Sequence, residues 1–163
     1  MVKPLFGSQG KGLQRVGFVE GVHRPLPSLE AGLAYLQRFI EQVSRPGFDW
    51  RVLVVGGHAV SAMRRVSEHW VHNVAQGARC EAAVLTDELA SLAERAAQAL
   101  DMDYAGVDLM PSATGAPIQV IEVNGVAAWQ GLQRVCGFNI ARAIVADLFE
   151  RKLAANISNA RRA

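Results

Sequence analysis

The sequence predicts an α+β fold in which antiparallel strands are backed by helices, and three observations carry that prediction. Two β-branched runs within 51–66 meet at a Gly-Gly pair, which is a strong signal for a β-hairpin. A second pair of apolar runs, 104–110 and 118–123, flanks a segment rich in turn-forming residues. Between the two pairs, residues 86–100 place Leu and Ala on one helical stripe, which predicts an amphipathic helix.

Short elements separated by glycine and proline are predicted for the first part of the chain. Residues 13–23 fit a strand, a glycine turn and a second strand, and two prolines end that pattern. Ser28 is a candidate cap for a short helix through Leu33. Residues 36–40 fit either a longer helix or a strand, because so short a run does not fix its periodicity. The polar, glycine-bearing segment 69–79 is predicted as a loop.

Helix signals are clearer in the second part of the chain. Thr86 is a capping residue, and the acidic pair that follows it favours the first turn of a helix. Gly137 precedes a last amphipathic helix that extends through Phe149. The residues after Leu153 are small and polar, so the end of the chain is expected to fray.

Composition is that of an ordinary globular protein. Of the 163 residues, 50% are hydrophobic and 20% charged, which excludes a disordered tail and a disulfide-dense mini-protein. The net charge of +2 gives little support to a nucleic-acid partner. Cys80 and Cys136 match no metal or redox spacing. No signal peptide and no apolar run of about 18 residues is present, so we expect a cytoplasmic protein without a membrane partner.

A glycine-rich segment with one lysine ahead of it opens the chain. Its members are Lys3, Gly7, Ser8, Gln9, Gly10 and Gly12. Glycines permit tight turns whose backbone N–H groups converge on phosphate oxygens. The order G-x-x-G-x-G, with a strand after it, is neither the dinucleotide fingerprint nor a P-loop. A mobile flap over nucleotide phosphates and a plain glycine-rich turn both fit this pattern.

Three oxygen-bearing side chains are predicted to converge on the second hairpin. Glu122 and Asn124 point to one face because side chains alternate along a strand. If the hairpin turns near Gly115, Asp108 falls opposite Glu122. Oxygen ligands without His or Cys suit Mg²⁺ or Mn²⁺. The alternative is a set of acids on the solvent face of an exposed sheet.

Basic residues on the first hairpin are candidates for anion binding. Arg51, Arg64 and Arg65 are able to clamp a phosphate or a carboxylate, since arginine matches both bidentately. A solvated strand end explains each of them equally well. The histidines have no ligand-like spacing and are interpreted as loop residues: His23, His58, His69 and His72.

Taken in this order, these elements resemble the ATP-grasp superfamily, and most closely its RimK-type carboxylate–amine ligases that add glutamate. The resemblance is carried by VKPLFGSQGKGL, FDWRVLVVGGHAVSAMRRVS, HNVAQGA, YAGVDLM and IEVNGVAAWQGLQ. It corresponds to the back half of such an enzyme, with the front expected ahead of Val2. It implies a remnant of the N-terminal ATP-grasp subdomain over 1–40, a C-terminal subdomain with the metal site over 41–155, and a flexible tail over 156–163.

The resemblance also implies a role for individual residues. It assigns ATP to Lys3, Gly7, Ser8, Gln9, Gly10, Gly12, Arg38, Phe39, Asp49 and Asn73. Within that set, Arg38 and Phe39 lie at the adenine hinge and Asp49 reaches the ribose. It assigns Mg²⁺ or Mn²⁺ to Asp108, Glu122 and Asn124, with stabilisation of the transferred phosphoryl group left to Arg64 and Arg65.

The implied reaction is phosphorylation of a carboxylate by ATP, followed by attack of an amino acid, here glutamate, on the acyl phosphate. Gln76 departs from the family pattern, which often has arginine there, and Ala127 stands where proline is common. The string NGVAAWQGLQ is similar to an ATP-grasp branch linked to pterin cofactors in methylotrophs.

Two other functions remain open at this point, namely an inactive nucleotide-binding fragment of such a ligase and a basic nucleic-acid-binding module. A shortened sheet also leaves an unpaired edge and an uncovered apolar face, so we expect a homo-oligomer.

Overall fold

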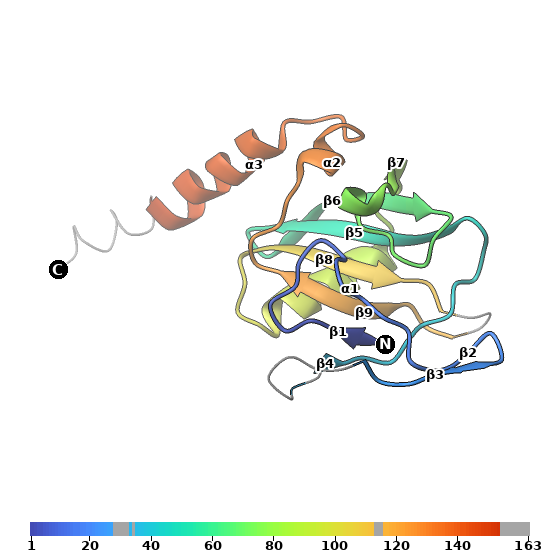
Figure 1. Ribbon diagram of the computed structural model, residues 1–163. Helices are drawn as coiled ribbons and strands as arrows, with labels where there is room; N and C mark the ends of the chain where they lie inside the picture. The colour runs from blue at the N-terminus through green and yellow to red at the C-terminus, as the bar shows by residue number, and fades with distance from the viewer. Residues whose placement is uncertain (28–32, 34, 113–115, 154–163) are drawn as a thin grey trace.

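The computed structural model describes residues 1–27, 33, 35–112 and 116–153, and its centre is a five-stranded antiparallel sheet (Figure 1). The strand order is β7-β6-β5-β8-β9. The strands are β5 (Gly47–Val55), β6 (His58–Ser67), β7 (Arg79–Ala83), β8 (Tyr104–Met110) and β9 (Gln119–Asn124). Both predicted hairpins, β5–β6 and β8–β9, are therefore confirmed. The edge strand β7 was not predicted.

Local sequence explains the two hairpins. Gly56 and Gly57 both adopt positive φ angles, 66° and 81°, which the tight β5–β6 turn requires and which glycine adopts without strain. In β8–β9, Asp108 pairs with Glu122 across the ladder, as the predicted turn position implies. Gly115, on which that prediction depended, lies outside the described residues.

Helix α1 (Asp87–Gln98) covers one face of the sheet. The Thr86 side chain accepts a hydrogen bond from the backbone N–H of Leu89, which confirms the predicted cap. The predicted apolar stripe faces the sheet and packs in a closed core. The buried members of this core are Val52, Val54, Ala62, Leu89, Ala93, Ala97, Ala105, Val107 and Leu109. Leu100 lies beyond the end of the helix and is exposed.

The opposite face of the sheet is covered at one end only. There α2 (Gln130–Gln133) and the start of α3 (Ile140–Asp147) pack Leu132 and Ile140 against Leu53 and Met63. Helix α3 continues as a π-helical segment, Leu148–Leu153, and extends away from the sheet (Figure 1). Its start after Gly137 is confirmed, whereas α2 was not predicted.

Two small ladders form the N-terminal part: β1 (Val2–Lys3) with β4 (Tyr35–Leu36), and β2 (Gly17–Val19) with β3 (Val22–Arg24). The β2–β3 pair confirms the predicted strand-turn-strand pattern. Strand is the correct alternative at the start of 36–40, and it ends at Leu36 because that is where pairing with β1 stops.

The remaining predictions concern the helix expected from Ser28, the C-terminal tail, the loop 69–79 and membrane-spanning helices. Most of the helix expected from Ser28 lies outside the described residues, as does the predicted tail. The predicted loop 69–79 contains one 3₁₀ turn, η2 (Val74–Gln76). No helix in the described part of the chain is long and apolar enough to cross a membrane.

Candidate functional site

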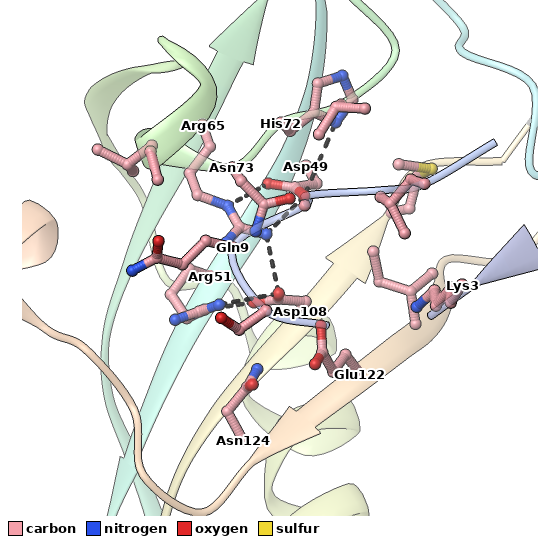
Figure 2. A pocket seen from close by; sticks show the side chains of 18 of the residues that line it. Lys3, Gln9, Asp49, Arg51, Arg65, His72, Asn73, Asp108, Glu122 and Asn124 are labelled. Atoms are coloured by element: carbon pink, nitrogen blue, oxygen red, sulfur yellow. Dashed lines mark hydrogen bonds and ion pairs between the residues drawn. The ribbon is translucent and has the colours of Figure 1, made fainter. Parts of the chain in front are cut away.

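A cavity of about 680 Å³ lies on the part of the sheet that α2 and α3 leave uncovered. Strands β5, β6, β8 and β9 form its floor, and the glycine-rich segment and the loop before β7 form its walls (Figure 2). Most of the residues that the sequence assigned to nucleotide and metal line it. These are Lys3, Gly7, Ser8, Gln9, Gly10, Arg38, Phe39, Asp49, Arg65, Asn73, Asp108, Glu122 and Asn124.

Strand alternation decides which charged side chains reach this cavity. Asp49, Arg51, Arg65 and Asp108 occupy alternate positions on three neighbouring strands and face it together (Figure 2). Arg64 lies one position away from Arg65, so its side chain is on the opposite face of the sheet. There it donates to Glu81 at 2.8 Å and stacks over the ring of Phe48. Arg64, predicted to act with Arg65, is thus outside the cavity that holds its neighbour.

Arg65 is the centre of a buried ion network. Its Nε and Nη2 atoms donate to the two carboxylate oxygens of Asp49 at 2.7 and 2.6 Å. Nη2 also lies 2.9 Å from Oδ2 of Asp108. Burial by itself lowers the pKa of Arg65, but the charges of Asp108 and Asp49 and their hydrogen bonds outweigh it and raise the pKa above its usual value. Arg65 is therefore a fixed cation, oriented toward the carboxylate of Asp108.

The other cation on Asp108 is Arg51. Its Nε donates to Oδ1 of Asp108, and its Nη2 donates to Oδ2 at 2.9 Å. The aliphatic part of Arg51 passes over Gly106, where an added Cβ would lie 3.1 Å from Cδ of Arg51. The same Cβ would lie 2.7 Å from Cβ of Ala127, so a side chain at position 106 would crowd both neighbours.

His72 lies in a loop, as predicted, but it is buried beside the network. The same interpretation is wrong for His23 and His58, which lie in β3 and at the start of β6. Its Nε2 lies 2.7 Å from Nε2 of Gln42, and its Nδ1 lies 3.7 Å from Oδ2 of Asp49. The loop that carries His72 folds back onto β5, so the ring is enclosed although the surrounding sequence is polar. Asp49, assigned to the ribose by resemblance, has both oxygens on Arg65 in this arrangement.

Asp108, Glu122 and Asn124 approach one another from neighbouring strands (Figure 2). The amide nitrogen of Asn124 donates to the carbonyl of Gly106 at 3.3 Å, which leaves its side-chain oxygen for another partner. Within the described residues, the Glu122 carboxylate has no hydrogen bond or ion pair. Two carboxylates and an amide oxygen form a donor set that suits a hard divalent cation such as Mg²⁺.

The glycine-rich segment folds down onto the loop before β7. Gln76 Nε2 donates to the backbone oxygen of Gln9 at 3.3 Å. Gly10 has a φ of 73°, and a Cβ there would lie 2.5 Å from Oδ1 of Asn73 and 2.7 Å from Cγ1 of Val71. Only glycine permits so close an approach. Gly12, also predicted to bind nucleotide, packs over Pro4 instead of lining the cavity.

Arg38 and Phe39, which follow β4 in the chain, form part of the cavity wall. The Phe39 ring packs edge-on against Trp70 with centroids 5.7 Å apart, and the Arg15 guanidinium lies 4.1 Å from its centroid. Aromatic packing therefore fixes this wall of the cavity.

Sequence reasoning did not assign two groups that complete the site, the pair of Arg51 with Asp108 and the pair of His72 with Gln42. The spacing Asp49-x-Arg51 on a strand indicates that these two residues share one face, but it does not identify Asp108 as the partner of Arg51. No comparable signal marks Gln42 and His72, because their contact depends on how two loops fold together.

Comparison with known protein families and proteins gives a consistent result. A model of the RimK-like ATP-grasp domain matches residues 1–148. The tetrahydromethanopterin:alpha-L-glutamate ligase of Methanococcus maripaludis is 37% identical over 150 residues, which cover 89% of this chain and 50% of that protein. The enzyme of the same name from Methanocaldococcus jannaschii is 36% identical, with 92% and 53% covered. The chain thus spans about half the length of the curated relatives it matches.

Solved structures of ATP-grasp ligases share the fold. The ligase PsnB, in complex with a phosphomimetic variant of its minimal precursor, Mg and ADP, has a TM-score of 0.51 and 25% identity, over 63% of this chain and 32% of that one. PsnB with its minimal precursor has a TM-score of 0.56 over 90% and 46% of the two chains. At 21% identity this second likeness concerns the fold alone.

Proposed function

The chain belongs to the RimK-like ATP-grasp family, and we propose that it supplies the nucleotide and metal site of an ATP- and Mg²⁺-dependent ligase that joins a carboxylate to an amino acid. The observation that carries this proposal is the pairing of Asp108 with Glu122 on the floor of a cavity that the glycine-rich segment also lines. The backbone that we propose binds phosphate and the oxygen atoms that we propose bind a cation thus face the same space.

The proposed chemistry has two steps. A carboxylate oxygen of the acceptor attacks the γ-phosphorus of ATP, the bond to ADP breaks, and an acyl phosphate forms. The amine nitrogen then attacks the acyl carbon, phosphate leaves with its bonding electrons, and the nitrogen loses a proton. Asp108, Glu122 and Asn124 would hold Mg²⁺, which neutralises phosphate charge when bound.

The remaining groups of the chain have roles that follow from where they lie. Lys3 and the N–H groups of 7–11 would bind phosphate oxygens from one wall of the cavity. Arg65 would stabilise the transferred phosphoryl group, because it is held as a cation beside Asp108. The glycine-rich segment, seated on Asn73, would exclude water from an intermediate that hydrolyses readily.

For the substrates, we propose glutamate as the amino acid and a carboxylate-bearing pterin as the acceptor. The curated relatives are named as ligases of alpha-L-glutamate, and the names of three of them include tetrahydromethanopterin. Gln76, which stands where glutamate ligases often have arginine, contacts the glycine-rich segment. We therefore expect Gln76 to hold the glycine-rich segment closed over the cavity.

Calorimetric titration with a non-hydrolysable ATP analogue, in Mg²⁺ and again in EDTA, tests the proposed function. We expect binding that depends on Mg²⁺ and that Asp108→Asn or Glu122→Gln abolishes, since each removes a ligand charge. Arg79→Gln, an exposed change on the same sheet, is the control and leaves binding unchanged. Equal binding by the parent and both acid variants would refute the metal site. Salt-sensitive binding of any polyanion would indicate the nucleic-acid alternative instead.

A further inference from the structure

Asp108 is already in contact with two cations at the atoms that a metal ion would use. Its side chain is 3% exposed, and Nε of Arg51 donates to Oδ1. Nη2 of Arg51 and Nη2 of Arg65 both lie 2.9 Å from Oδ2. A divalent cation binds the same lone pairs that these N–H groups approach. Three of the roughly four lone-pair positions of this carboxylate are therefore occupied, so a divalent cation competes with the guanidinium groups for Asp108.

Of the two arginines, Arg51 is the one free to move. Arg65 is 5% exposed and makes two further hydrogen bonds, at 2.7 and 2.6 Å, to Asp49. Arg51 is 12% exposed, lines the cavity, and has Asp108 as its single acidic partner within the described residues. Displacing Arg51 breaks one ion pair, whereas displacing Arg65 also leaves Asp49 buried without its cation, which is costly.

A displaced Arg51 stays within the site. Arg51 lines the same cavity as Asp108 and Glu122, and its stem is packed beside Gly106, so its guanidinium has room to stay near both acids when the contact is broken. A free guanidinium binds a planar carboxylate or a phosphate through two parallel hydrogen bonds.

We propose that Arg51 is an exchangeable counter-ion: it neutralises Asp108 until a divalent cation displaces it, and it then binds the carboxylate or acyl phosphate of the substrate. This inference rests on the proposed metal site and adds an order of events, in which the cation must bind before Arg51 becomes available. It identifies Arg51 as a substrate-binding residue.

Competition between Arg51 and the cation is measurable by calorimetry with Mn²⁺ alone as the probe. Arg51→Gln should bind Mn²⁺ about tenfold more tightly than the parent, since the ion pair between Arg51 and Asp108 no longer has to be broken. Arg51→Lys keeps the charge but makes one contact at a time, so its affinity should lie between the two. Arg79→Gln, on an exposed part of β7, should match the parent. Unchanged or weaker Mn²⁺ binding by both Arg51 variants would overturn the proposal.

Displacement is also measurable in the unmodified chain with phenylglyoxal, which labels accessible guanidinium groups, followed by peptide mass spectrometry. Arg51 should be labelled in saturating Mn²⁺ and protected in EDTA, while Arg65 stays protected and Arg79 reacts in both. Adding acetonylphosphonate, a stable mimic of an acyl phosphate in which CH₂ replaces the bridging oxygen, should protect Arg51 again. Bound Mn²⁺ without labelling of Arg51 overturns the inference alone. Failure to bind either Mn²⁺ or the Mg²⁺–nucleotide complex overturns the proposed function and the inference with it.

Discussion

The two faces of the five-stranded sheet are built from the same strands and differ in almost every physical respect. Toward α1, strands β5 and β8 present Val52, Val54 and Val107, all fully buried. Toward the cavity, the alternate positions of these strands present Asp49, Arg51 and Asp108, which contact other charged groups. The α1 face is held by burial of apolar area, whereas the part of the other face that lines the cavity is held by ion pairs that depend on each other.

That difference separates the face that stabilises the fold from the face on which we propose that the chemistry takes place. Burying apolar side chains is favourable without any particular partner. Burying an ion pair gains little, because desolvation of the charges offsets their attraction, yet removing one partner is strongly unfavourable. The buried charges that face the cavity are therefore suited to exchange one ionic partner for another. The apolar core under α1 has no ionic partners to exchange.

Arg65→Met should show the largest effect on stability. It leaves Asp49 buried without its cation and Asp108 with Arg51 alone, so the free energy of unfolding should fall by about 3–5 kcal/mol. Urea denaturation followed by circular dichroism measures this change.

A matched control lies one residue away, on the α1 side of the same strand. Arg64→Met breaks a half-exposed ion pair with Glu81, so it should cost less than about 1 kcal/mol. Equal losses from the two variants would contradict the contrast between the faces.

Leu89→Ala should be nearly as destabilising, by about 3 kcal/mol, because it opens a cavity between α1 and the sheet. Leu89 is buried in the core that contains Val52 and Val107. Since that core lies behind the sheet, the affinity for Mg²⁺ and the ATP analogue should be unchanged in the folded variant. A folded variant with weakened nucleotide binding would show that the two faces are coupled.

Local sequence patterns predicted much of the difference between the two faces of the sheet. Alternation placed Asp108 and Glu122 together, and the stripe after Thr86 identified the helix that covers the other face. These inferences needed only periodicity and one turn position. The burial of His72 and the pairing of Arg51 with Asp108 depend on long-range contacts between loops and strands, and no local pattern encodes those. Strand β7 was missed for the same reason, as its pairing with β6 defines it.

Gly10→Ala should weaken binding of the ATP analogue about tenfold, roughly 1.4 kcal/mol, without altering the sheet. The added methyl group would lie 2.5 Å from Oδ1 of Asn73, so the glycine-rich segment could not seat on the cavity. Gly17→Ala is the control, since it has a similar φ of 84° but no atom within 4 Å of the added carbon. Calorimetric titration with the ATP analogue in Mg²⁺ compares the affinities of the two variants. Equal weakening by both would attribute the loss to backbone strain alone.

The smallest expected effect concerns the cap of α1. Thr86→Ala removes the hydrogen bond that the Leu89 N–H donates to the threonine hydroxyl, which should lower the free energy of unfolding by about 1 kcal/mol. Thr86→Ser keeps an accepting oxygen and should recover most of that loss. Because the cap lies on the apolar side of the sheet, neither variant should alter Mn²⁺ affinity or the labelling of Arg51. A cap variant that changed either readout would mean that the charged face depends on helix packing. That result would contradict the conclusion that the two faces of the sheet are independent.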